Sequence, residues 1–358
     1  MVKALVKMVI LEKIILLCLF KLNGERTIYS IYHLLKGKKS SQTIQDIHLF
    51  SLTKYFGLYS ALTREFLDDF IDSALKKGWI TPCPNQQHHF FVTASGNLVI
   101  EHHLQQKPIP KFVDGWKYQQ RTLLVWTRLS LLVQVVSNLV NQNSGYIPIQ
   151  KNKEVHHWLK QSLEKYRVPR TMLGEKLFSE LVACLEGEKD INPSVLVYRL
   201  TGHDRIGLTS SQAAQEMIMH VDEYELDFLN VLHYMIQAVE NNPDRFEILT
   251  SLLSGTNHSY TLTNSTQRTF ELLKKAYTID EIAAMRNLKT STVEDHIVEI
   301  ALNVTDFSID DFVNPEIQDS ILKTARILPT RQLKLIRENV NIASYFEIRL
   351  VMAKIGER

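Results

Sequence analysis

The stretch from Thr278 to Asn303 reads TIDEIAAMRNLKTSTVEDHIVEIALN and decides the fold of the C-terminal region. Thr278 and Glu281 have the spacing of a capping box at a helix start, and apolar residues then recur at helical intervals. After a short turn around Leu288, Ser291 and Glu294 repeat the capping-box spacing. Two helices joined by so short a turn predict a helix-turn-helix.

The second of these helices is expected to bury Val293, Ile297 and Ile300, and the small Ala283 permits a close crossing with the first. The positions expected to face a partner or DNA are polar or acidic: Ser291, Thr292, Glu294, Asp295 and Glu299. Acidic side chains oppose approach to phosphates, and a helix that reads the major groove usually presents Arg, Lys, Asn or Gln. The sequence therefore leaves open whether this helix reads DNA or docks a protein partner.

The run EIAAMRNLKTSTVEDHI, followed downstream by SYFEIRLVMAKIG, resembles the helix-turn-helix domain at the C-terminus of some RecQ-type DNA helicases. The chain as a whole is similar to the YpbB family of bacterial proteins, which carry that domain without a motor. The resemblance implies a non-enzymatic DNA-binding accessory protein that assists a RecQ-type helicase in DNA repair or recombination.

Composition indicates a folded protein of about two or three domains, because 358 residues with 45% apolar content suffice for several cores. The net charge is only +2, too small to identify a nucleic-acid partner by itself. The basic excess lies near the N-terminus, where residues 1–110 hold 13 Lys and Arg against 8 Asp and Glu.

Three isolated cysteines without a CxxC pair indicate a reducing compartment, and we expect a cytoplasmic protein. The segment from Thr122 to Val140 is long enough to span a bilayer. However, polar residues recur in it every three or four positions, and Arg128 would cost about 2.5 to 3.5 kcal/mol at mid-membrane. We interpret it as an amphipathic core helix and expect no membrane partner.

The N-terminal region has the element order of a winged helix. Helices are predicted over 26–36, from about Ser41, and over 60–77, followed by a hairpin that Thr93-Ala-Ser-Gly closes. The alternative is an ordinary α+β scaffold. The fold class is therefore mainly α, with three domains: a winged-helix-like module at 1–106, a helical bundle or connector at 116–253, and an all-α helix-turn-helix domain at 256–358.

No catalytic motif is convincing. The run Gly202 to Thr209 has the spacing of a phosphate-binding loop, but Leu208 replaces the lysine that faces the outer phosphates. We interpret it as a turn that leads into a helix. Adjacent histidine pairs such as His88 and His89 have no further ligand at a usual interval. We therefore expect no enzyme, cofactor, metal site or small-molecule substrate.

Two basic clusters are candidate DNA contacts. Lys36, Lys38 and Lys39 precede a helix start whose free amides bind anions, and Gln42 and Thr43 could add hydrogen bonds. A solvated loop is the alternative. In the second cluster, Arg331, Lys334 and Arg337 recur every three residues, which predicts one side of a helix, and a solvated face is again the alternative.

Two other functions remain open at this point. A helix-turn-helix transcription regulator would read specific duplex sites with two such units. A protein-only scaffold would use the helix-turn-helix for packing. The sequence does not distinguish single-stranded, duplex and forked DNA.

Overall fold

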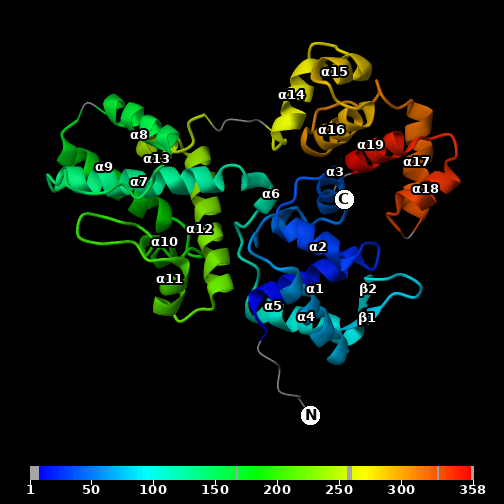
Figure 1. The fold of residues 1–358 in the computed structure, drawn as a ribbon, viewed down its shortest axis with the longest axis horizontal. Helices are drawn as coiled ribbons and strands as arrows, with labels where there is room; N and C mark the ends of the chain where they lie inside the picture. The colour runs from blue at the N-terminus through cyan, green and yellow to red at the C-terminus, as the bar shows by residue number, and fades with distance from the viewer. Residues whose placement is uncertain (1–7, 167, 256–259, 329, 356–358) are drawn as a thin grey trace. The chain divides into compact units, whose positions relative to one another are not determined.

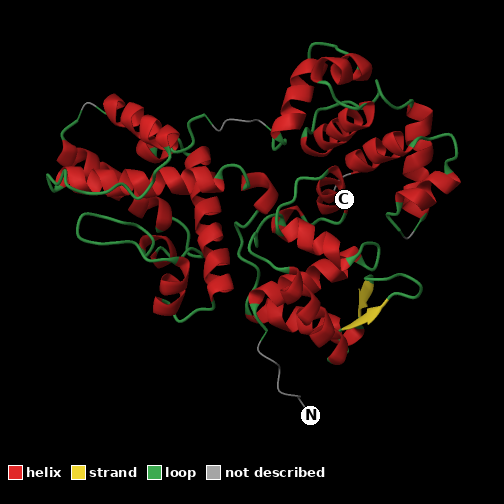
Figure 2. Cartoon of the chain, in the orientation of Figure 1, coloured by secondary structure: helices red, strands yellow, loops and turns green. Residues whose placement is uncertain are grey.

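The computed structural model describes residues 8–166, 168–255, 260–328 and 330–355. As predicted, the fold is mainly α: within these ranges, the β-structure is one short hairpin (Figure 2). The chain divides into two compact units. The central unit comprises residues 1–13, 104–114 and 118–257, and the terminal unit comprises residues 14–103, 115–117 and 258–358.

The N- and C-terminal thirds of the chain thus share one compact unit. The division into three domains predicted from the sequence stays a prediction. Of the boundary predicted at 254–259, residues 256–259 lie outside the described residues.

The terminal unit holds most of the helices and the hairpin (Figure 1). Its elements, lying wholly or mainly within it, are α1 (Ile10–Leu22), α2 (Ile28–Leu35), α3 (Ser41–Leu49), the 3-10 turn η1 (Thr53–Tyr55), α4 (Arg64–Lys76), β1 (Ile80–Pro82), β2 (Phe90–Val92), α5 (Ala94–Gln106), α6 (Gly115–Tyr118), α14 (Asn264–Leu273), α15 (Ile279–Arg286), α16 (Thr290–Asn303), α17 (Pro315–Ile327), α18 (Leu333–Asn339) and α19 (Tyr345–Ile355).

The N-terminal part of this unit has the predicted order of three helices, α2 to α4, followed by a hairpin. The strands pair antiparallel, with Ile80 opposite Val92. The segment from Thr93 does not simply close the hairpin, because Ala94 begins the helix α5, which was not predicted from the sequence. Gly96 is required there, since a Cβ at this position would lie 2.2 Å from the Trp79 carbonyl oxygen.

The helix-turn-helix is present as α15 and α16. Thr278 and Glu281 form the predicted capping box, and Asn287 ends α15 in the left-handed conformation, with φ 50°. The second predicted capping box is wrong: α16 begins at Thr290 after Lys289, whose side chain makes no cap hydrogen bond. The N-cap position thus lies at Lys289, two residues before the predicted Ser291.

The helix α16 lies at the centre of the terminal unit. It packs against α14, α15, α19 and, from the N-terminal part of the chain, α3. The predicted apolar face is confirmed, since Val293, Ile297 and Ile300 are fully buried. Burial on several sides exceeds what a free recognition helix would show.

Of the last three helices, only α18 begins at a residue that differs from the predicted one. Asn314 caps α17 ahead of Pro315, and Ser344 and Glu347 form the predicted reciprocal bonds at the start of α19. The helix expected from Thr330 instead begins at Leu333. Arg331 therefore precedes α18 rather than lying on it.

The central unit is a helical bundle. Its helices are α7 (Thr122–Val140), α8 (Lys153–Lys165), α9 (Arg170–Leu185), α10 (Ser194–Val197), α11 (Ser210–Glu216), α12 (Val221–Asn241) and α13 (Glu247–Ser251). Thr209 forms a capping box with Gln212 at the start of α11, so the loop that resembles a phosphate-binding loop is a helix-leading turn.

Among the described helices, α7 alone has the length and hydropathy to cross a membrane. Leu129, Leu131 and Leu132 place it in the hydrophobic core of the central unit. Part of its polar side is also buried, at Ser130, Gln134 and Asn138, unlike that of a surface amphipathic helix. The reason is local: the Gln134 side chain bonds the loop that follows α7, donating to the Ile147 carbonyl at 3.0 Å and accepting from the Ile149 amide at 2.9 Å.

Candidate nucleic-acid interface

The acidic residues of α16 are held inside the terminal unit rather than presented to a ligand. Glu299, expected to be exposed, is only 6% exposed. Its carboxylate accepts hydrogen bonds from the Thr263 amide and hydroxyl and from the Thr266 hydroxyl, the last at 2.7 Å. Burial raises the pKa of Glu299, and these hydrogen bonds oppose the rise. Glu299 therefore fixes α14 to α16, and the expectation that it faces a partner is wrong.

The other two acidic positions on α16 are half-buried. Asp295 forms an ion pair with Arg349 of α19 at 2.6 Å. Burial raises the pKa of Glu294, partly opposed by the nearby Arg349. Full exposure on this helix is confined to its first turn, at Thr290 and Ser291, and Thr292 is half-buried. Four of the five residues predicted on this helix lie within its first two turns. Because α16 packs against four other helices, it cannot lie lengthwise in a groove of DNA.

A buried histidine completes the polar core beneath α16. His296 is 8% exposed, and its Nδ1 lies 2.8 Å from the Thr269 hydroxyl on α14. The Arg286 guanidinium donates to Thr269 and to the Ser265 carbonyl oxygen. Burial, reinforced by the Arg286 charge, lowers the pKa of His296 to about 4. The helix-turn-helix is thus tied to α14 through polar groups on its inner face.

The first basic cluster is divided by the structure. The Lys36 ammonium donates to the Leu62 carbonyl oxygen at 3.1 Å and is half-buried, so it serves the fold. Lys38 and Lys39 are exposed, and neither side chain makes a hydrogen bond or ion pair to a described residue. Burial lowers the pKa of Lys39, opposed by the attraction of Glu299. Two of the three lysines therefore remain available to a phosphate.

The polar residues predicted to help these lysines are also divided. Thr43 is buried, and its hydroxyl lies 2.8 Å from that of Ser40, which caps α3 by accepting from the Thr43 amide. Thr43 is therefore a structural residue rather than a DNA contact. Gln42 is exposed, and its amide donates to the Asp46 carboxylate at 2.8 Å.

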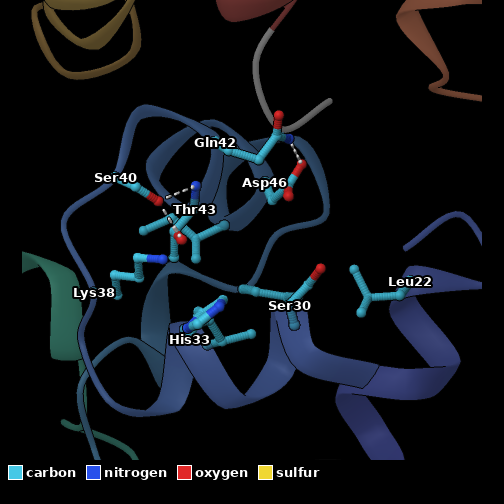
Figure 3. A pocket seen from close by; sticks show the side chains of 11 residues that line it. Leu22, Ser30, His33, Lys38, Ser40, Gln42, Thr43 and Asp46 are labelled. Carbon is cyan, nitrogen blue, oxygen red and sulfur yellow. Dashed lines mark hydrogen bonds between the residues drawn. The ribbon is translucent and has the colours of Figure 1, made fainter. Parts of the chain in front are cut away.

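A cavity of about 170 Å³ opens between α2 and α3 at this cluster. Figure 3 shows Lys38 and His33 on one side of it, with Ser40, Gln42 and Asp46 on the other. Asp46 forms an ion pair with Arg26 at 2.9 Å. Burial raises the pKa of Asp46, and the charge of Arg26 opposes this rise. A carboxylate in the wall disfavours a phosphate inside the cavity. The cluster therefore offers its cations at the rim.

All three cations of the second basic cluster are exposed, and each also has a contact within the protein. The Arg331 guanidinium lies 5.8 Å from the centre of the Phe50 ring, and its amide donates to Glu25 at 2.9 Å. Arg337 lies 4.4 Å from the centre of the Tyr345 ring. Lys334 is exposed, with Glu338 at 4.0 Å one turn on. Because Arg331 precedes the helix, the three cations do not form the predicted stripe.

Sequence reasoning missed the cations and rings that surround the first cluster. Arg64, at the start of α4, is exposed and lies over two tyrosines of α2, Tyr29 and Tyr32. Lys36 also lies over Tyr32, at 5.3 Å. The sequence could have indicated part of this cluster, because the spacing of Tyr29, Tyr32 and Lys36 places them on one face of a helix. The partner Arg64 could not be assigned, because it lies on a different helix.

The helix pair α15 and α16 makes this a helix-turn-helix protein, a class that supports DNA binding. Residues 265–352 match the family model described as a helix-turn-helix domain. The chain is 38% identical over 338 residues to protein YpbB of Bacillus subtilis (strain 168), covering 94% of this chain and 95% of that relative. The chain belongs to the YpbB family, which confirms this part of the resemblance found in the sequence. No solved structure matches the chain.

Proposed function

We propose that this protein is a cytoplasmic, non-enzymatic DNA-binding accessory protein that assists a RecQ-type helicase in DNA repair or recombination. The observation that carries the proposal is the pair of exposed lysines, Lys38 and Lys39, in the same compact unit as the helix-turn-helix domain. Exposed cations supply most of the affinity for a phosphate backbone. Gln42, exposed beside them, is the third proposed contact.

In this proposal the helix-turn-helix docks the helicase through its exposed end. The accessible surface there includes Ser291, Thr292 and the apolar Met285 of α15, which is 58% exposed. The helicase as partner rests on the resemblance of residues 281–297 and 344–356 to the domain that such helicases carry. A chain with this domain and no motor motif is suited to act beside an enzyme that has one.

The DNA contact is tested by replacing Lys38 and Lys39 with Ala and titrating labelled DNA at several salt concentrations. The slope of log affinity against log salt should flatten by about 0.7 to 0.9 for each phosphate that the variant no longer neutralises. The matched control is Lys334→Ala with Arg337→Ala, which removes the same charge from α18 and should leave the slope unchanged. Equal slopes for wild type and the loop variant would contradict the proposal.

The docking surface is tested separately by co-purification with a RecQ-type helicase. Met285→Asp should abolish capture while leaving DNA affinity unchanged, because Met285 is exposed and distant in sequence from the lysines. Capture of wild type and variant to the same extent would exclude this surface as the docking site.

A protein-only scaffold is the second candidate, and the burial of α16 among α3, α14, α15 and α19 favours it. It predicts no DNA binding even at low salt. The same burial disfavours a transcription regulator, since α16 cannot present a row of side chains to base edges.

A further inference from the structure

The outward side of α2 carries a cluster of rings and cations beside the lysine loop, and Lys36 of that loop lies 5.3 Å from the centre of the Tyr32 ring. We define the α2 aromatic face as Tyr29, Tyr32, His33, Arg64 and His88. The Arg64 guanidinium carbon lies 5.3 Å from the centre of the Tyr29 ring and 5.6 Å from that of Tyr32. The His88 ring, from the hairpin loop, lies 5.2 Å from the Tyr29 ring.

These side chains reach solvent to different degrees. Arg64 and His88 are exposed, and both tyrosines are half-buried. Neither tyrosine hydroxyl bonds any described residue, so the phenols are not used to hold the fold together. The pair of Arg128 and Trp158 is a cation–ring contact of the other kind: the Trp158 ring is only 8% exposed, so this contact belongs to a core.

The face is continuous with the lysine loop. His33 lies on α2 beside Tyr32, and burial lowers its pKa, with further lowering by the charges of Lys38 and Arg64. His33 and Lys38 line the same cavity, and Arg64 lies over the neighbouring Tyr32. Exposed lysines and partly exposed rings thus occupy one surface of the terminal unit.

The surface also has a direction. On α4, which begins at Arg64, four acidic residues are exposed: Glu65, Asp68, Asp69 and Asp72. A polyanion is repelled from that side and attracted toward Lys38 and Lys39. A polyanion is therefore expected on the α2 side of Arg64 rather than along α4.

We infer that the α2 aromatic face binds single-stranded DNA, with unpaired bases stacking on Tyr29 and Tyr32 while Lys38 and Lys39 contact the backbone. Sequence-tolerant single-strand binding combines these two elements, aromatic platforms and a positively charged track. In a duplex the bases are already paired and stacked, so the rings cannot reach their faces. This inference rests on the proposed DNA binding and adds the form of DNA that is bound.

The test compares three probes of about 15 nucleotides, within the usual site sizes for such surfaces: a labelled thymidine strand, an abasic strand of the same length, and a duplex. Fluorescence anisotropy of the full chain gives each affinity. The wild type should bind the thymidine strand more tightly than either of the others. The abasic strand keeps the phosphates and removes the bases, so it isolates stacking from charge.

The variant Tyr29→Leu with Tyr32→Leu keeps apolar bulk and removes both rings. It should weaken binding to the thymidine strand at least about fivefold, the lower end for one stacked base, and leave the abasic strand unchanged. Tyr29→Phe with Tyr32→Phe should bind like wild type because the ring faces remain. The matched control is Tyr345→Leu, which removes a ring that is 43% exposed beneath Arg337 elsewhere in the unit.

Arg64→Gln is the second variant, since an exposed side chain can be changed without endangering the fold, and it should also weaken binding to the thymidine strand only. Equal losses on the thymidine and abasic strands, or no loss on either, would overturn the inference. Competition by poly-glutamate as effective as by thymidine strand would also overturn it, in favour of an acidic peptide ligand.

The two proposals fail in different ways. If wild type binds duplex as tightly as single strand, and Lys38→Ala with Lys39→Ala weakens both, the inference falls and the proposed DNA binding stands. If wild type binds none of the three probes at low salt, both fall together.

Discussion

The helices α16 and α2 make opposite use of similar amphipathic sequences. The helix α16 belongs to the helix-turn-helix and was the expected reading element, yet four helices cover it and its Glu299 is buried. The helix α2 was expected to matter only for the lysines after it, yet it presents two half-exposed tyrosines beneath an exposed Arg64. A helix-turn-helix motif therefore identifies a fold, whereas the surface that binds is decided by what packs over each helix.

The largest difference should be in stability. Ile297→Ala removes a fully buried side chain from α16 and should lower the free energy of unfolding by about 2 to 5 kcal/mol. Tyr32→Leu, on the half-exposed face of α2, should cost less than about 1 kcal/mol. Urea denaturation of both variants measures this. Equal losses would mean that the two helices are buried alike.

The next difference concerns pH. The pKa of buried His296 is lowered to about 4, below the ordinary value near 6.5. Its neutral form therefore stabilises the folded terminal unit above about pH 6.5, and this stabilisation is lost as the pH falls through that range toward 4. The loss should be about 1 to 3 kcal/mol. Glu299, with a raised pKa, acts in the opposite direction at the acid end.

A histidine titration by NMR measures this directly. The His296 ring protons should keep their neutral-form shifts until the pH approaches about 4. An inflection near pH 6.5, the ordinary histidine value, would show that the inner side of α16 is open to water.

The smallest effect should come from the acidic edge of α4. Asp69→Asn with Asp72→Asn removes two exposed negative charges and should strengthen binding of single-stranded DNA about twofold at low salt. The same change made on α17, Glu316→Gln with Asp319→Asn, should have no effect. An unchanged affinity in the α4 variant would contradict the proposed repulsion of the strand from α4.

Much of the fold follows from local signals. The capping pairs Thr278 with Glu281 and Ser344 with Glu347 act over three residues, so spacing alone predicts them. The second box failed because the same spacing occurs at Ser291 and Glu294 without the backbone turn that uses it. Periodicity likewise predicted the buried Val293 and Ile297.

The site was harder to predict because its contacts are distant in sequence. Glu299 is buried because Thr263 and Thr266, on another helix, satisfy its oxygens. Lys36 was counted with its neighbours, yet it donates to the Leu62 carbonyl oxygen, 26 residues away. Likewise, Arg64 meets Tyr29 and Tyr32 only because α4 folds back against α2.

Photo-crosslinking of a strand that carries 5-iodouracil, followed by peptide mapping, tests where DNA lies on the full chain. Iodouracil couples to the aromatic ring it stacks on, so crosslinks should map to Tyr29 or Tyr32 and diminish in the double Leu variant. Crosslinks confined to residues 290–303 of α16 would contradict the assignment of DNA to α2 and restore the helix-turn-helix as the reading element.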